Sequence, residues 1–453
     1  MAFYLTDESV LAIMATNSFL QRKPQANSKE ERMFLRLHYL KHCNYSIDNN
    51  AYLMSDNQPI QLLPNTIYTH VSFNFQGHSS SPDLVIVHSN QIELANLCIS
   101  YHPMKEPLIQ LSLAQLLCLK LGYEIQTTKL LCINSKFNLK TTNAYFFKPI
   151  VVSNKTNHIV AKLKPYLTSQ APLPLKPTAL HHETTAIFQL NHLSYKKKQT
   201  YFSQGIRSFH NILDQIPDLT RQQKRQCEVE LSNTPFVDYD ALRLFFAKLS
   251  DTIQFFDIEA CQFPYPLFFT THPFETFPFL FSVHRYTIAS EQESHRYTFF
   301  YPDSDFRRLF AEALIQQLDA SQTIIIFDPS LEKIIFKSLA NAFPDLAKQL
   351  LLRMNNFLDI STLFINHHVV IPGMKGKYSL KHIINAIQDK TLYDELSIQS
   401  GFHAAHAYKY LYYQKNYPNE AVKNEIVAYA KSDTKSLLII YNFLRHLYSK
   451  KGV

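Results

Sequence analysis

The order of apolar and polar residues predicts a chain in which strands and helices alternate. Three early segments, rich in β-branched and aromatic residues, are typical of strands: 66–75, 82–89 and 128–137. Residues 108–122 repeat apolar side chains at helical spacing and end at Gly122, which favours a helix with a glycine cap. Strands with an intervening helix indicate a small α/β domain, which we assign to residues 1–168.

The second half repeats this alternation with a clearer pattern. Strands are predicted over four segments: 251–261, 277–288, 295–302 and 322–328. Helices are predicted over three: 305–320, 331–343, and from Asn419 to about Ser449. We therefore expect a second α/β domain over residues 251–453, with a mixed sheet flanked by helices.

Residues 169–250 connect the two domains. The segment SQAPLPLKPT (169–178) holds three prolines, which exclude a helix interior or a central strand and indicate a linker. The basic stretch 191–226 predicts two or three short helices. From the sequence, it is either a simple solvated connector or a surface that touches DNA.

The composition of the chain limits the classes of partner, location and binding site that we expect. The 453 residues carry a formal charge of +8, which suits a polyanionic partner but equally serves solubility. No apolar stretch is long enough to span a bilayer, and Asp7 and Glu8 stand where an export signal would carry basic residues. The six cysteines form no C-x-x-C pair, so we expect reduced thiols and a cytoplasmic protein. No P-loop or G-x-G-x-x-G motif is present.

Acidic residues recur at three informative places in the second half. Asp257 and Glu259 lie two apart in a predicted strand, so both project from one face, and like charges side by side favour a divalent cation. Asp328 ends a buried strand, and Glu332 lies one turn into the next helix. Taken alone, each acid also fits a solvated surface or a helix cap.

The third place is Tyr429 and Asp433 in the last helix, where a spacing of four puts both on one face. An acid pair on a first strand, an acid at a strand-to-helix junction and Y-x-x-x-D on a C-terminal helix follow in this order. This series resembles the three motifs of DnaQ-like exonucleases, in the tyrosine variant of proofreading domains.

A wider resemblance supports the same family. The runs FDIEACQFPYPLFFTTHPFETFPFLFSVH, FDPSLEKIIFKSLANAFPDLAKQL, PGMKGKYSLKHIINAI and LYDELSIQSG are similar to a bacterial family. Its members join a RecB-type, restriction-endonuclease-like N-terminal domain to a DnaQ-like domain with an RNase H-like fold. The resemblance covers about residues 250–447 well and the rest loosely.

The resemblance implies a 3′–5′ exonuclease that hydrolyses single-stranded DNA or RNA with two Mg²⁺ or Mn²⁺ ions. Asp257, Glu259 and Asp433 would hold one ion, and Asp257 and Glu332 the second. Tyr429 would orient the attacking water. Oxygen ligands suit these ions better than zinc.

Two further positions follow from the resemblance. Asp328 stands on the substrate side of the site, where the family usually has Asn, so its extra charge puts activity or substrate choice in question. Asp359 ends another strand and is expected to lie behind the metal ligands.

The loop PGMKGKYSLK (372–381) is a candidate for binding the nucleic-acid backbone. Lys375, Lys377 and Lys381 surround Tyr378, and basic side chains with an interleaved aromatic bind phosphates and stack on bases. A solvated turn is the alternative.

In the N-terminal domain, Asp83 fits the first acid of a RecB-type site and Glu93 the second. Ala95 occupies the lysine position of E-x-K. We therefore expect this domain to be non-catalytic. For the whole protein, two alternatives to the exonuclease stay open: an inactive module that binds nucleic acid or a protein, and a structure-specific endonuclease.

Overall fold

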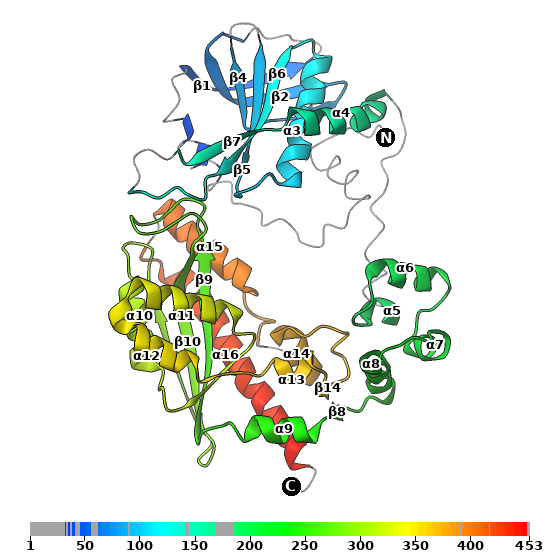
Figure 1. Ribbon diagram of the computed structural model, residues 1–453, viewed down its shortest axis with the longest axis vertical. Coiled ribbons are helices and arrows are strands. Elements are labelled where there is room, and N and C mark those ends of the chain that lie inside the picture. The colour runs from blue at the N-terminus through cyan, green and yellow to red at the C-terminus, as the bar shows by residue number, and fades with distance from the viewer. Residues whose placement is uncertain are drawn as a thin grey trace. The chain divides into compact units, whose positions relative to one another are not determined.

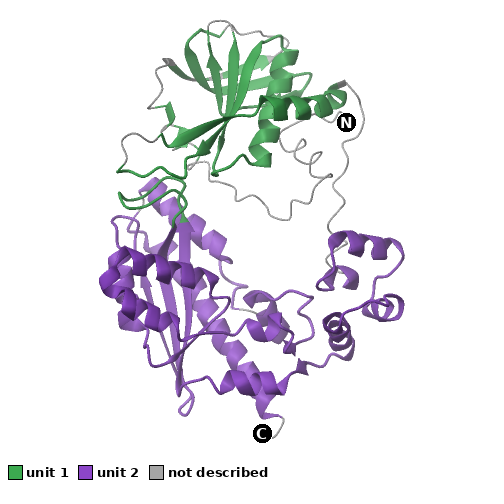
Figure 2. Cartoon of the chain, viewed as in Figure 1, with its two compact units in different colours: residues 1–178, 262–275 green, residues 179–261, 276–453 purple. Residues whose placement is uncertain are grey.

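The computed structural model describes residues 32, 35–36, 39–40, 46–55, 62–88, 91–140, 145–168, 185–388, 392–415 and 417–450. The chain divides into two compact units (Figures 1 and 2). Unit 1 comprises residues 1–178 and 262–275, and unit 2 comprises residues 179–261 and 276–453. Each unit contains a sheet and helices, which confirms the α/β class. The predicted linker at 169–178 lies outside the described residues.

Unit 1 is built on a seven-stranded mixed sheet in the order β1-β2-β4-β5-β6-β7, with β3 paired to β2. The strands are β1 (Ser46–Ser55), β2 (Thr66–Phe75), β3 (His78–Ser80), β4 (Leu84–Val87), β5 (Ile92–Cys98), β6 (Ile125–Ile133) and β7 (Phe147–Val151). The predicted early helix is α3 (Lys105–Lys120), and α4 (Ser153–Thr168) follows β7. Gly122, just beyond α3, has a φ of +85°, the left-handed conformation for which glycine is suited.

Both faces of this sheet are buried. Helices α3 and α4 pack on one face around Leu94 and Leu117. The opposite face buries Leu97 and also receives residues 262–275, the segment that leaves unit 2 between two of its strands. Tyr265 and Phe274 of this segment pack among unit 1 aromatics.

Unit 2 contains a five-stranded mixed sheet in the order β11-β10-β9-β12-β13. The strands are β9 (Thr252–Gln262), β10 (Thr276–Thr287), β11 (Gln292–Phe299), β12 (Thr323–Ile326) and β13 (Phe357–Asp359). β10 and β11 are antiparallel, whereas β9, β12 and β13 run parallel. The four strands predicted in this half are therefore present.

Helices cover both faces of this sheet (Figure 1). One face carries α10 (Arg307–Gln317), α11 (Ser330–Ala342) and α12 (Pro344–Met354). The other carries the long α16 (Glu420–Ser449), drawn in red, with α14 (Leu380–Ile387) and α15 (Gly401–Gln414) beside it.

The basic stretch 191–226 forms three short helices, as predicted: α6 (Tyr195–Ser203), α7 (Phe209–Gln215) and α8 (Arg221–Ser232). Two further short helices flank it, α5 (Ala186–Gln189) and α9 (Tyr239–Phe246). Ser208 and Thr220 begin α7 and α8 with capping boxes, which satisfy backbone N–H groups at each start. A two-stranded sheet pairs β8 (Phe236–Val237) with β14 (Val369–Val370), and α13 (Thr362–Ile365) precedes β14. In the described part of the chain, no helix is both long and apolar enough to cross a membrane.

Candidate metal centre

Strand β9 presents two acids on one face. Its side chains alternate: Phe255 packs against Tyr441 of α16, whereas Phe256 packs against Phe336 of α11. Asp257 and Glu259 continue the Phe255 series, so they project toward α16. The apolar residues that precede them in the strand are fully buried, which fixes this register.

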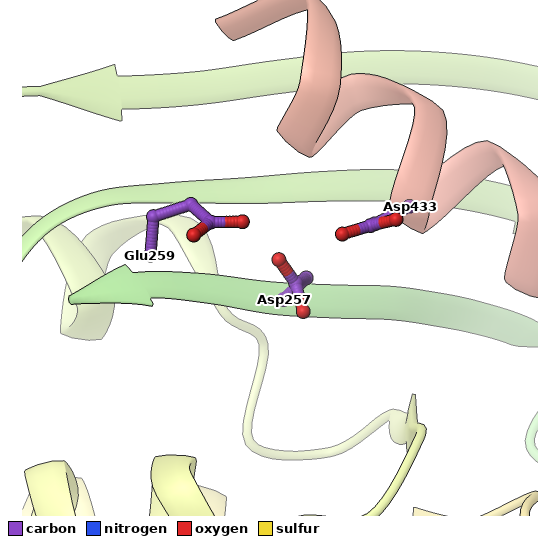
Figure 3. A group of neighbouring side chains, drawn as sticks. All are labelled: Asp257, Glu259 and Asp433. Atoms are coloured by element: carbon purple, nitrogen blue, oxygen red, sulfur yellow. The ribbon is translucent and has the colours of Figure 1, made fainter. Parts of the chain in front are cut away.

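Helix α16 brings Asp433 to the same place. The next residue, Thr434, is fully buried and contacts β10 through His284 Nδ1 at 2.7 Å and Ser282 Oγ at 2.9 Å. This anchor fixes the helix rotation that turns Asp433 to the sheet. One carboxylate oxygen from each of Asp257, Glu259 and Asp433 lies within 4.8 Å of the others (Figure 3).

Glu332 reaches the cluster from the first turn of α11. The pairing of β12 with β9 ends where Ile325 lies opposite Phe255, so Asp257 and Glu259 lie beyond the segment of β9 that pairs with β12. A hydrogen bond from the backbone of Ile258 to Glu332 lowers the pKa of this carboxyl. Burial and the charges of Asp328 and Asp359 outweigh it and raise the pKa of Glu332 to about 7.

The pKa values of the other three carboxyls are also raised. Burial, followed by the neighbouring carboxylates, raises the pKa of Asp257 and of Glu259 well above the usual range. Burial raises the pKa of Asp433 to about 6, although hydrogen bonds from Tyr393 and Tyr429 oppose the shift. Four acids that repel one another in a buried place require protons or cations.

Within the described part of the chain, two buried oxygens of this cluster have no hydrogen-bond partner: Asp257 Oδ2 and Glu332 Oε2. Buried polar atoms are rarely left unpaired in folded proteins, and a metal ligand atom is one explanation. An all-carboxylate set fits Mg²⁺ or Mn²⁺, which prefer oxygen donors. The residues present therefore fit a divalent cation.

Two further side chains, Tyr393 and Lys381, lie beside the cluster. Tyr393, which sequence reasoning missed, is buried. Its hydroxyl donates a hydrogen bond to Asp433 Oδ1 at 2.5 Å and lies 3.1 Å from Ser436 Oγ, which can donate to it. Lys381, in the first turn of α14, holds its ammonium 4.4 Å from the centre of the Tyr393 ring and 5.3 Å from that of Tyr429. Its charge lowers the pKa of Glu259 and of Asp433.

Helix α15 begins against the cluster. A Cβ at Gly401, its first residue, would lie 3.4 Å from Glu259 Oε2. This is an ordinary van der Waals distance, so the start of this 14-residue helix lies close to the carboxylate. The positive end of the helix dipole faces a negative group there.

The residues of the loop predicted to bind substrate do not all face the same way. Tyr378 does not face outward: its hydroxyl contacts His367 Nε2 at 2.8 Å and accepts a hydrogen bond from Asn191. Lys375 and Lys377 are exposed in the loop, whereas Lys381 points to the acids. The substrate-binding roles of these four residues stay predictions.

Asp328 is exposed at the end of β12. Its carboxylate accepts a hydrogen bond from Ser330 Oγ at 2.6 Å, and its N–H donates to Asp359 Oδ1 at 3.1 Å. Its φ of +52° is left-handed, a conformation that Asn and Asp tolerate better than most residues. This geometry explains how Asp can stand where the resemblance gives Asn. Asp359 holds the turn through its carboxylate.

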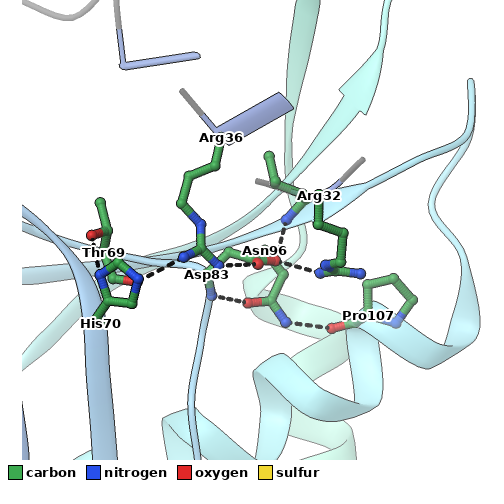
Figure 4. A network of polar contacts seen from close by, with 8 residues as sticks. Arg32, Arg36, Thr69, His70, Asp83, Asn96 and Pro107 are labelled. Carbon is green, nitrogen blue, oxygen red and sulfur yellow. Dashed lines mark hydrogen bonds and ion pairs between the residues drawn. The ribbon is translucent and has the colours of Figure 1, made fainter. Parts of the chain in front are cut away.

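The buried acid of unit 1 has a different environment (Figure 4). Asp83 accepts hydrogen bonds from Arg32 at 2.6 Å, from Arg36 at 3.0 Å and from the backbone N–H of Leu97 at 2.8 Å. Its own N–H donates to Asn96 Oδ1 at 2.9 Å.

Glu93 is not beside Asp83. In the β4–β5 register Leu84 lies opposite Ala95, and Ile86 lies opposite Glu93, so the residue that faces Asp83 is Asn96. Glu93 pairs with Lys129 of β6 at 2.6 Å, and Lys129 lies directly opposite Ala95. The lysine absent from the E-x-K position is thus present on the neighbouring strand, paired with Glu93.

A family model matches part of the chain. Residues 254–379 match a family described as a domain of unknown function (DUF2779). This segment begins in β9, contains Asp257, Glu259 and Glu332, and ends before Lys381 and α16. No curated protein and no solved structure matches the chain.

Proposed function

We propose that unit 2 is a metal-dependent 3′–5′ exonuclease that hydrolyses phosphodiester bonds of single-stranded DNA or RNA. The convergence of Asp257, Glu259 and Asp433, with Glu332 beside them, carries this proposal. These acids come from a strand and two helices that are distant in sequence, and they match the ordered motifs of DnaQ-like exonucleases. The mixed sheet flanked by helices is also the architecture that the resemblance leads us to expect.

The chain's own residues define the proposed chemistry. Asp257, Glu259 and Asp433 would hold one Mg²⁺ or Mn²⁺ ion, and Asp257 and Glu332 a second. Such a pair, when bound, activates water and stabilises the leaving oxygen of a phosphodiester. Tyr429 hydrogen-bonds to Asp433, so its hydroxyl stays beside the carboxylates, where we assign it to orienting the water.

The proposed nucleic-acid partner and cytoplasmic location rest on other observations. The net charge of +8 favours a nucleic-acid partner, and the exposed Lys375 and Lys377 are available to phosphates. Cys98, Cys118, Cys132 and Cys227 are buried and form no disulfide, in keeping with the proposed cytoplasmic location. The 3′–5′ polarity rests on the resemblance.

A second candidate is an inactive module that keeps the fold and binds nucleic acid or a protein. Asp328 favours it, because an exposed carboxylate near Glu332 repels an approaching phosphate. An endonuclease is the third candidate, and the length of the products separates it from an exonuclease.

The test uses 5′-labelled single-stranded DNA and RNA with Mg²⁺ or Mn²⁺. We expect products that shorten one nucleotide at a time from the 3′ end, and their loss in Asp257→Ala. Asp240→Asn is the matched control, because this acid of α9 is 88% exposed. Intact strands with the wild-type protein, or equal cleavage by Asp257→Ala, would refute the proposal. Internal fragments would instead support the endonuclease.

A further inference from the structure

Lys381 is held beside the acid cluster by aromatic rings. The rings of Tyr393 and Tyr429 lie 6.1 Å apart, and the ammonium lies within cation–π range of both. Among the described residues, no carboxylate forms an ion pair with Lys381. The charge is therefore directed at the cluster without being bound to one acid.

The balance of charges at the acid cluster indicates a role for Lys381. Two divalent cations neutralise four ionised carboxylates. A nucleic-acid strand that binds there then adds one negative charge for each phosphodiester group. Lys381 is a described cation whose charge acts on both Glu259 and Asp433. Lys435, on the same helix as Asp433, is paired with Glu293 at 2.5 Å.

We propose that Lys381 binds a non-bridging oxygen of the phosphodiester at the acid cluster, and that Tyr393 positions both this lysine and Asp433. This inference rests on the proposed function and names a substrate contact within it. Tyr393 acts through two different groups: its ring supports the ammonium, and its hydroxyl holds the carboxylate. Substitutions separate the two roles because they remove one group at a time.

The lysine is tested with Lys381→Met, which keeps the length of the side chain and removes its charge. Lys337→Met is the matched control, since this lysine of α11 is exposed. We measure Mn²⁺ binding by calorimetry, the salt dependence of binding to labelled oligothymidylate in Ca²⁺, and cleavage in Mn²⁺.

For Lys381→Met we expect kcat to fall by about 10²–10³-fold, as for loss of one preorganised electrostatic group. The salt slope should fall by about 0.7, the value for one single-strand phosphate contact. Mn²⁺ affinity should stay equal or increase, because a positive charge has left the cluster. Lys381→Arg should recover part of the rate.

Tyr393→Phe removes the hydroxyl and keeps the ring. We expect Mn²⁺ affinity to fall by about 10-fold, as for loss of a residue that orients a metal ligand, with the salt slope unchanged. Tyr410→Phe, at an exposed tyrosine of α15, is the control.

Three results would overturn the inference. An active wild-type protein whose Lys381→Met variant keeps its rate and salt slope contradicts the phosphate contact but leaves the exonuclease intact. A Lys381→Met defect that excess Mn²⁺ cures shows instead that the lysine serves the carboxylates. If the wild-type protein cleaves nothing, the exonuclease proposal fails, and an unchanged salt slope in Lys381→Met then rejects the contact as well.

Discussion

The buried acids of the two units have opposite electrostatic surroundings. In unit 1, two arginines and a backbone N–H surround Asp83, so the protein itself neutralises the carboxylate. In unit 2, the acids face one another, and Asp257 and Glu332 each keep a buried oxygen without a partner. The difference teaches that burial of an acid is no sign of a metal site by itself. The sign is a group of buried acids with too few cations from the chain: in unit 2, Lys381 supplies one positive charge for four carboxyls.

The largest expected difference concerns catalysis. Asp257→Asn should lower the proposed nuclease rate by at least about 10³-fold, because it removes a ligand that both ions share. Asp83→Asn should leave the rate per folded molecule unchanged. Single-strand degradation by both variants, normalised to the folded fraction, checks this contrast. Equal losses in the two variants would remove the distinction between the units.

The second difference is a dependence of stability on pH. The folded-state pKa values of Asp433 and Glu332, about 6 and about 7, exceed their ordinary values of 3.8 and 4.5. The folded protein therefore keeps protons that the unfolded chain releases, and without divalent cations stability falls as pH rises from about 4 to 7. We expect each of these two groups to contribute a loss of roughly 2–3 kcal/mol across this window.

Urea unfolding in EDTA at several pH values measures this loss. Glu332→Gln should make the decline shallower, and the difference between it and wild type cancels the contribution of other groups. Mn²⁺ should restore more stability at pH 7.5 than at pH 5. A decline that is identical in Glu332→Gln would show that the cluster is not its source.

The third prediction concerns the buried acid of unit 1, where removal of the negative charge should lower stability. Asp83→Asn should destabilise the protein by about 2 kcal/mol, because Arg32 and Arg36 lose their partner; the value is below that of a fully buried pair since both arginines are partly exposed. Urea unfolding with Glu124→Gln, at an exposed acid of unit 1, provides the comparison. A more stable Asp83→Asn would mean that this carboxylate also lacks compensation.

The smallest effect is expected at the second ion pair of unit 1. Lys129→Met leaves Glu93 without its lysine, but His88 stays 3.6 Å away and the lysine was partly exposed. We expect a loss of about 1 kcal/mol in the free energy of unfolding. Lys120→Met, at an exposed lysine of α3, is the control. A loss as large as that of Asp83→Asn would rank the two pairs equally.

Periodicity made part of the site predictable. Alternation in β9 gives the common face of Asp257 and Glu259, and helical spacing gives that of Tyr429 and Asp433. These relations are local, so they can be read from the sequence. The α/β class follows in the same way from the alternation of strands and helices.

The remaining contacts depend on tertiary structure. Tyr393 lies between α14 and α15, in a segment without regular periodicity, 40 residues before the acid it contacts. The inward turn of Tyr378 depends on Asn191, 187 residues away. Lys129 reaches Glu93 because of the register between β5 and β6, which the sequence of either strand alone does not determine.

We propose that the acids of unit 2 bind divalent cations from outside the chain. Crystals soaked in Mn²⁺ test it most directly, because anomalous scattering locates the ions. The account predicts two peaks about 3.5–4 Å apart, bounded by Asp257, Glu259, Glu332 and Asp433, and none at Asp83. Absence of manganese from the cluster in unit 2, or equal occupancy beside Asp83, would contradict the account.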